Sequence, residues 1–301
     1  MQFLQQIVNG ITIGAFYALV ALGYTMVYGV LKLINFAHGD LFMWGAYLGL
    51  TGLTVVLAAL GYTTPWAILP VVIFVMTSVA LIGVLVERIA YRPLRSAGRL
   101  APVISALGVA FILQSLARNV YGASWKTYPQ GLTPSGGLVL AGGVRVSLMQ
   151  IIVLVASFLL MAGLYLFVHR TRVGTAMRAV SLDHDVSRLM GIDVDRIIMI
   201  VFLIGPGLGG VAGLIVALYY GSFDFTLGWV FGLKAFIAAI LGGIGNIPGA
   251  MLGGMLLGII ETLGAGYMSP QWKDVIAYLI LILILIFRPT GLLGERVAEK
   301  L

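Results

Sequence analysis

One glycine-rich stretch, Gly242–Gly249 (Gly-Gly-Ile-Gly-Asn-Ile-Pro-Gly), has a composition that could bind phosphate. Backbone N–H groups in such a loop can cradle the phosphates of a nucleotide. A P-loop also requires a lysine followed by serine or threonine, and that pair is missing here. A tight turn between closely packed helices explains the stretch better. The sequence therefore predicts that this chain does not hydrolyse nucleotide itself.

Metal chemistry and acid–base catalysis have few candidate residues. The chain has three histidines at spacings that fit no metal-binding motif: His38, His169 and His184. The carboxylate pairs Asp183/Asp185 and Asp193/Asp195 fall in one charged loop, where a solvated surface is the simpler interpretation. Asp193 or Asp195 is well placed to cap the helix that follows. We therefore expect no catalytic residue, no metal and no cofactor.

Two charged residues, Lys234 and Glu261, lie inside long apolar segments, where an ionised group is costly and often functional. A short turn at Gly243–Ile247 separates their segments, so the two helices should be antiparallel neighbours. The residues would be offset by about 7 Å along the helix axis, a gap that long side chains and a tilt can span. The two residues could therefore form a buried ion pair. The alternative is that Lys234 reaches the outer interface while Glu261 meets water in a cavity.

The charged loop His169–Arg196 contains an amphipathic pattern. Its apolar residues recur at i, i+4, i+7 and i+8, which places them on one helical face: Leu182, Val186, Leu189 and Met190. Asp183 borders this stripe, and Gly191 is a natural helix stop. A short helix of this kind could lie on a lipid surface or insert into a groove of a soluble partner. The pattern alone does not decide between the two.

The overall composition places these residues in a membrane protein. Of 301 residues, 60% are hydrophobic and only 10% are charged, with a mean hydropathy of +1.07, whereas a soluble domain carries about 25% charged residues. The 40 glycines would let membrane helices approach closely. There are no cysteines, which excludes disulfides and thiolate metal sites. We expect an all-α, polytopic membrane helical bundle that forms a single domain over residues 1–301.

Apolar runs predict about eight or nine transmembrane helices, some of them short or broken. The first run lacks the basic residues of a cleaved signal peptide, so we expect it to be retained. A polar loop, Gly122–Val146, separates the fourth and fifth spans. The expected spans are about Gln5–Leu31, Asp40–Leu60, Trp66–Glu87, Pro102–Tyr121, Ser147–Val168, Ile197–Tyr219, Trp229–Gly242, Pro248–Gly264 and Asp274–Phe287.

Basic residues set the expected orientation, because cytoplasmic loops carry an excess of lysine and arginine. With the Arg88–Arg99 loop inside, 13 of the 18 basic residues face the cytoplasm. They include Arg92, Arg95, the arginines of the 169–196 loop, Arg296 and Lys300. The N-terminus is then outside and the C-terminus inside. This distribution accounts for the net charge of +7, so we expect no nucleic-acid partner.

Four motifs together resemble the branched-chain amino acid ABC importer permeases of the LivH class. They are Asn35-Phe36-Ala37-His38-Gly39-Asp40, the stretch Gly174–Ile192 with Asp183 and Gly191-Ile192, the stretch Leu241–Ala250, and Arg288-Pro289-Thr290-Gly291-Leu292-Leu293-Gly294. The resemblance covers essentially the whole chain. It implies a multi-pass permease in the bacterial inner membrane that moves branched-chain or related hydrophobic amino acids into the cytoplasm.

The resemblance also implies partners: a second homologous permease subunit, two ATP-binding-cassette ATPase subunits, an extracytoplasmic substrate-binding protein and membrane lipid. In such importers the loop holding Asp183–Gly191 would be the coupling helix seated on an ATPase. Its implied contact residues are Asp183, Val186, Leu189, Met190 and Gly191. The substrate stays open, because related permeases serve urea, short amides and other amino acids, and no substrate-binding residue can be named.

Two other classes of protein remain as alternatives. A secondary transporter or channel acting alone would transport without an ATPase, but the spans contain no chain of carboxylates and histidines that could relay protons. An intramembrane enzyme would need a paired nucleophile and base within the spans, and the sequence offers none. The alternatives are separated by whether the purified chain transports by itself.

Overall fold

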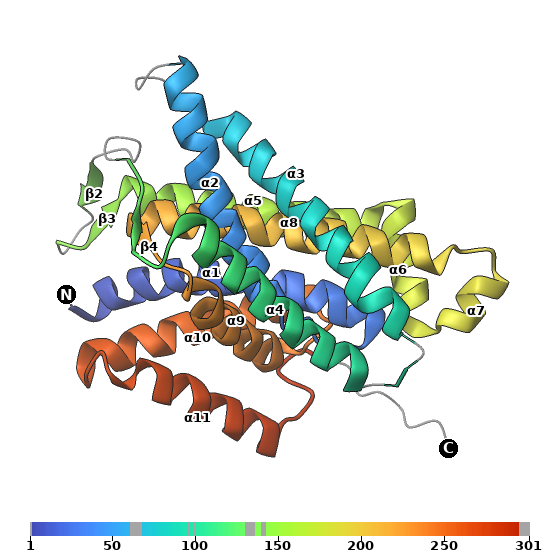
Figure 1. Ribbon diagram of the computed structural model, residues 1–301. Helices are drawn as coiled ribbons and strands as arrows, with labels where there is room; N and C mark the ends of the chain where they lie inside the picture. Colours follow the sequence, from blue (N-terminus) through green and yellow to red (C-terminus); the bar gives the residue numbers. More distant parts are fainter. Residues whose placement is uncertain are drawn as a thin grey trace.

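The computed structural model describes residues 2–60, 68–95, 97–98, 100–129, 136–139 and 143–294 (Figure 1). Helices dominate this part of the chain, with four short strands in the connections. The helices are α1 (Gln2–Leu31), α2 (His38–Leu60), α3 (Ile68–Val86), η2 (Glu87–Tyr91), η3 (Arg92–Leu94), α4 (Leu100–Tyr121), α5 (Leu148–Arg170), α6 (Arg172–Leu182), α7 (His184–Leu189), α8 (Val194–Tyr220), α9 (Leu227–Gly242), α10 (Ile247–Tyr267) and α11 (Trp272–Phe287). The strands are β1 (Lys126–Thr127), β2 (Gly137–Val139), β3 (Arg145–Ser147) and β4 (Ser222–Phe223).

The strands and the short helices mark two opposite ends of the bundle. Strand β1 pairs with β4, and β2 pairs with β3, both antiparallel. They lie at the left of Figure 1, and α6 and α7 lie at the right. We call these the strand end and the α7 end. Helix α1 runs from one to the other, because Gln5 bonds the backbone of Arg145 in β3 and Val30 contacts His184 of α7.

Helix α1 lies at the centre of the bundle. It is 30 residues long, and most of its side chains from Gly10 onward are buried. Its closest neighbour is α10, and the two backbones touch where glycines face each other. A Cβ atom on Gly258 would lie 2.2 Å from the backbone nitrogen of Gly14. Since apolar side chains gain nothing by leaving lipid, this close backbone packing is what holds the two helices together.

A second packed unit is formed where α2 and α3 lie against α8. A Cβ atom on Gly45 of α2 would lie 2.1 Å from the carbonyl oxygen of Gly210 in α8. Helix α8 also contains Pro206, which cannot donate a backbone hydrogen bond, yet the helix continues past it. Its ring packs beside Gly83 of α3. Prolines and glycines are tolerated in such helices because neighbouring elements support the backbone.

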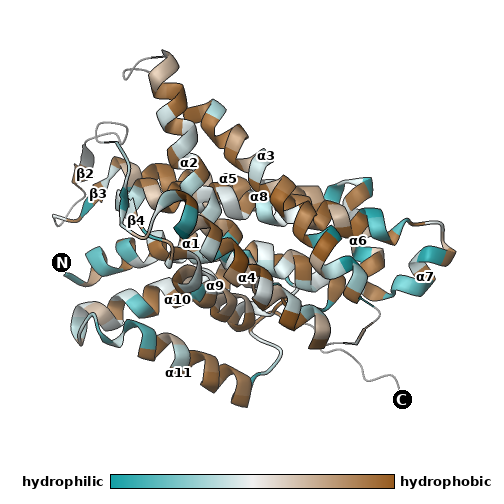
Figure 2. Cartoon of the chain, viewed as in Figure 1, coloured by the Kyte–Doolittle hydropathy of each residue, from teal (hydrophilic) through white to brown (hydrophobic). Residues whose placement is uncertain are grey.

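The outer helices present apolar side chains to their surroundings, as lipid-facing helices must. Figure 2 shows hydrophobic colour along α3, α5 and α11 and hydrophilic colour gathered on α7. Large side chains that are more than half exposed include Ile73, Leu81, Ile104, Phe111, Phe158, Leu159 and Ile286. In water such a surface would aggregate, so these helices face the bilayer.

The predicted fold class is confirmed. Among the described residues, seven helices are long and apolar enough to cross a membrane. Helix α9 is shorter, at 16 residues, and α11 also has 16. The predicted spans match these helices with ends that differ by a few residues; the predicted start at Trp66 lies outside the described residues, as do Arg99, Arg296 and Lys300. The strands are a feature that the sequence did not predict.

Candidate functional site

The α7 end is built on a tight turn between α5 and α6. The side chain of Thr171 accepts a hydrogen bond from the backbone nitrogen of Gly174 and so caps α6. Gly174 is required because a Cβ atom there would lie 2.2 Å from the carbonyl oxygen of Val168. The turn folds α6 back onto the bundle, where Met177 and Val180 are buried.

The predicted single amphipathic helix is in fact divided in two at Asp183. This residue has an extended backbone, with φ −158° and ψ 119°, and ends α6 after Leu182. Its Oδ1 atom accepts hydrogen bonds from the backbone nitrogens of Asp185 and Val186, at 2.9 and 3.1 Å. Aspartate side chains compete with the helical backbone in this way, so the interruption of α6 is also the N-cap of α7.

Four apolar side chains stand out from the surface around α7. The exposed fractions are 85% for Leu182, 54% for Val186, 87% for Leu189 and 77% for Met190. Leu182 ends α6 and Met190 follows α7, so the group spans both helices rather than one stripe. Ser187 of α7, in contrast, is buried. Helix α7 therefore rests on the bundle through one side and leaves an apolar surface on the other.

Helix α7 is fixed at both of its ends. The Nε2 atom of His184 lies 2.8 Å from the carbonyl oxygen of Val30 in α1, and it donates because a carbonyl only accepts. At the other end Gly191 has a φ of +81°, and the backbone nitrogen of Ile192 bonds the carbonyl of Ser187. Asp193 then caps α8 through the backbone nitrogen of Arg196, which confirms one of the two predicted caps.

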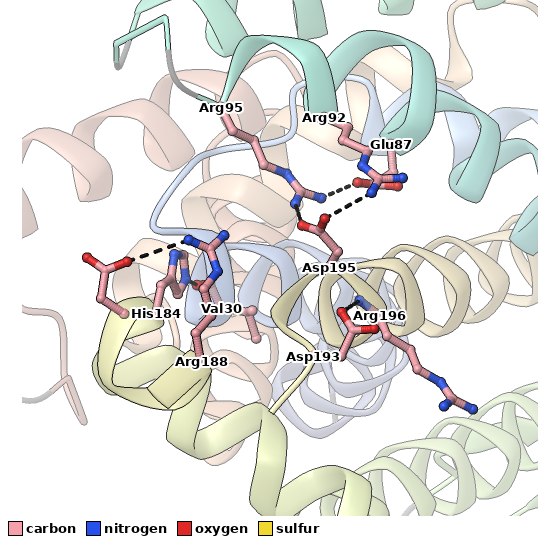
Figure 3. A network of polar contacts seen from close by, with 10 residues as sticks. Val30, Glu87, Arg92, Arg95, His184, Arg188, Asp193, Asp195 and Arg196 are labelled. Carbon is pink, nitrogen blue, oxygen red and sulfur yellow. Dashed lines mark hydrogen bonds and ion pairs between the residues drawn. The ribbon is translucent and has the colours of Figure 1, made fainter. Parts of the chain in front are cut away.

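A polar cluster beside α7 is the feature that the sequence did not indicate (Figure 3). Asp195 in the first turn of α8 binds Arg92 at 2.9 Å and Arg95 at 2.6 Å, and Arg95 also binds Glu87. From sequence alone, Arg92 and Arg95 count only as charges that set topology, and Asp195 only as an alternative helix cap. The one sequence feature that could have indicated the cluster is the spacing of the two arginines, three residues apart and shortly after a glutamate.

A second polar cluster lies inside the bundle and includes the two residues singled out from sequence. The Nζ atom of Lys234 in α9 lies 2.8 Å from Oε1 of Glu261 in α10. Glu261 also accepts a hydrogen bond from the hydroxyl of Tyr17 in α1, at 2.8 Å, and Lys234 also contacts Asp274 of α11, at 2.9 Å. Tyr17 and Asp274 were not predicted. The cluster ties together four helices.

A cavity of about 1150 Å³ opens at the α7 end. It lies between α1, α5, α6 and the turn from α9 to α10, and its lining includes Thr25, Tyr28, His169, Arg178 and Asn246. The glycine-rich stretch that resembles a phosphate loop forms this turn, and Asn246 caps α10 by accepting from Gly249. The stretch therefore has the helix-turn role that was expected. Among the described residues no group of three or more His, Cys, Asp or Glu side chains could hold a metal ion.

Comparison with known proteins gives consistent matches along the whole chain. Residues 6–285 match the family described as "Branched-chain amino acid transport system / permease component". The protein BraD of Pseudomonas aeruginosa, a high-affinity branched-chain amino acid transport system permease protein, is 45% identical over 99% of this chain and 98% of its own. LivH of Escherichia coli is 39% identical over 100% and 98%, and a probable LivH of Methanocaldococcus jannaschii is 31% identical over 92% and 88%.

Proposed function

Because the chain belongs to the family of branched-chain amino acid transport permeases, we propose that it is the membrane-spanning subunit of an ATP-binding-cassette importer. Its substrates are branched-chain or related hydrophobic amino acids, as the names of its relatives indicate for those proteins. The family is one of transport permeases rather than enzymes. Urea, short amides or other amino acids are the alternative substrates, and radiolabelled uptake by the assembled importer distinguishes them.

The importer is completed by a second homologous permease, two ATPase subunits and an extracytoplasmic binding protein. The permease lies in the bacterial inner membrane with the α7 end in the cytoplasm and the N-terminus outside. The basic residues support this orientation, since Arg92, Arg95, Arg178 and Arg188 all belong to short elements or turns on the α7 side. The 1150 Å³ cavity is then open to the cytoplasm.

The single observation that carries the proposal is the exposed apolar surface around α7. Leu189 is 87% exposed at the end of a charged loop, where water would disfavour it. A helix held at both ends, by His184 and by the turn at Gly191, presents that surface rigidly. A membrane anchor would be superfluous in a chain that already crosses the bilayer many times. A groove in an ATPase subunit covers the surface instead, with Val186, Leu189 and Met190 inserted.

The test is Leu189→Asp, which places a charge at the centre of the proposed contact. The variant should insert in the membrane but fail to retain the ATPase subunits during purification of the complex. Leu138→Asp is the matched control, because Leu138 is also an exposed leucine (59%) and lies in β2 at the opposite end. Normal ATPase retention by Leu189→Asp would contradict the docking role.

A transporter that works alone is separated from this proposal by reconstitution. The purified chain in liposomes should give no uptake of leucine, and uptake should appear when the binding protein, the second permease and the ATPase subunits are added together with ATP. Uptake by the chain alone would favour the secondary transporter.

A further inference from the structure

The surface around α7 is joined to the first turn of α8 by a very short connection. Helix α7 ends at Leu189 and α8 begins at Val194, capped by Asp193. The bond from Ile192 to Ser187 closes the connection onto α7 itself. No long flexible linker separates α7 from α8, so a displacement of α7 must displace the N-terminus of α8. The first charged side chain on α8 after the cap is Asp195.

Both oxygens of the Asp195 carboxylate are occupied by arginines of η3 and the residue after it, in the segment that continues α3 beyond η2. Arg92 binds Oδ2 and Arg95 binds Oδ1 (Figure 3). The Arg92 contact is about half exposed on both sides, and exposed ion pairs contribute little. Arg95 is only 19% exposed. Arg95 is therefore the stronger of the two links between α8 and α3.

Arg95 also reaches into the bundle. Its second terminal nitrogen binds Glu87, whose side chain is 5% exposed. A planar guanidinium can hold two carboxylates in fixed directions at once, which an ammonium group cannot do. The Arg95 guanidinium therefore bridges two carboxylates, one in α8 and one at the start of the segment η2. Without Arg95, Glu87 would be a buried charge with no ion pair among the described residues.

Segment η2 carries the connection further, toward the middle of the bundle. It is a π-helical turn, a rare form that occurs mostly as short insertions in helices and frequently at functional sites. Its last residue, Tyr91, is buried with its ring centroid 5.1 Å from that of Phe202 in α8. The Tyr91 hydroxyl donates to Oδ1 of Asn35 at 2.9 Å, and the same oxygen accepts from the backbone of Ala37. Ala37 directly precedes α2.

We propose that Arg95 is a positioning residue that passes movement of α7 to α2 and α3. The route runs from Asp195 through Arg95 and Glu87 to η2, and from Tyr91 to the link between α1 and α2. The inference rests on the proposed function, in which an ATPase subunit moves α7. Each step is a direct contact between named groups, and the elements joined are short turns rather than flexible loops. By this route the movement of α7 reaches α2 and α3, which cross the membrane.

The experiment measures the number of substrate molecules transported per ATP hydrolysed by the complete importer in liposomes. Arg95→Gln should lower this ratio roughly 5-fold or more, the lower end of typical coupling between sites, while ATPase subunits still co-purify. Arg95→Lys should restore part of the ratio, because an ammonium group can still bind one of the two carboxylates. If Arg95 only stabilised the fold, Arg95→Gln would lower the yield of folded importer and leave the number of substrate molecules transported per ATP unchanged.

Two further variants keep the outcome interpretable. Glu87→Gln with Arg95→Gln removes both charges together, so the fold carries no unpaired buried carboxylate, and the ratio should still fall. Arg196→Gln is the control, since its guanidinium is on the same turn of α8 but points away from the cluster and forms no ion pair among the described residues. A ratio equal to that of the unmodified importer in the double variant would overturn the proposal. Failure of the unmodified chain to retain ATPase subunits would instead refute the proposed function.

Discussion

The intramembrane charge cluster gives the sharpest test of stability. Among the described residues, Lys234→Met would leave the Glu261 carboxylate, 2% exposed, with only the Tyr17 hydroxyl as a partner. Breaking a buried ion pair by removing one member costs about 3–5 kcal/mol. The lost contact with Asp274 adds little, because that side chain is 68% exposed and such pairs contribute about 0–1 kcal/mol. We therefore expect a loss of about 3–5 kcal/mol in the free energy of unfolding.

The reverse variant should be milder, and the asymmetry follows from Asp274. Glu261→Gln leaves Lys234 with Asp274 as an ion-pair partner, so the expected loss is about 1.5–3 kcal/mol, the range for one hydrogen bond to a charged group. In the double variant no buried charge remains unpaired. Its loss should be smaller than the sum of the two single losses by about 0.5–3 kcal/mol, as is usual for residues in contact.

Denaturant unfolding of the purified chain in lipid nanodiscs, followed by tryptophan fluorescence, measures these differences. Lys273→Met is the control, because it removes the same charge beside the cluster from a lysine with no ion pair among the described residues. It should change stability by less than about 0.5 kcal/mol. Additive losses in the double variant, or a Lys234→Met loss as small as that of Lys273→Met, would refute the reasoning. Exchanging the two residues, as Lys234→Glu with Glu261→Lys, should restore only part of the lost stability, since position 234 would then present a carboxylate to Asp274.

Three further outcomes are expected. In a chain without natural cysteines, Ser124→Cys should react with an impermeant thiol reagent added to intact cells and Ser181→Cys should not; the opposite pattern would reverse the orientation. Gly258→Ala should destabilise the bundle by about 1–3 kcal/mol because its Cβ atom would meet Gly14, whereas Gly108→Ala, with open space around it, should be neutral in the same unfolding assay. The isolated permease should bind leucine too weakly to be detected by calorimetry at micromolar concentrations, because its spans contain few polar groups. Tight binding would instead show that the permease, rather than the binding protein, selects the substrate.

The helical architecture was predictable because hydropathy alone determines it. Apolar runs of sufficient length can only form helices in lipid, and the predicted spans agree with α1 to α5 and α8 to α11. The short strands were not predictable in the same way. Residues such as Lys126 and Ser222 carry no alternating pattern, and their pairing depends on where α8 brings the chain back.

The polar contacts were predictable only where one sequence constraint dominated. Lys234 and Glu261 flank a single short turn, so their proximity follows from helix geometry. Asp195 and Arg95 are 100 residues apart and meet because α3 packs on α8. No local pattern encodes that packing. The division of the 182–190 stripe was missed for a different reason: periodicity favoured one helix, while the capping bonds of Asp183 outweighed it.

The two polar clusters constrain different parts of the bundle, and this determines where α7 can produce movement. The Lys234 cluster ties α9, α10 and α11 to α1, and glycine contacts between Gly14 and Gly258 leave no space for sliding there. Helix α7 contacts α1 through His184, whereas α8, which follows α7, contacts the η2–η3 segment through Asp195, and η2 contacts the α1–α2 link through Tyr91. Backbone packing holds α10 against α1, and the equally close packing of Gly45 on Gly210 holds α2 against α8. We therefore expect α2, α3 and α8 to shift together, as one unit, when α7 is displaced during transport.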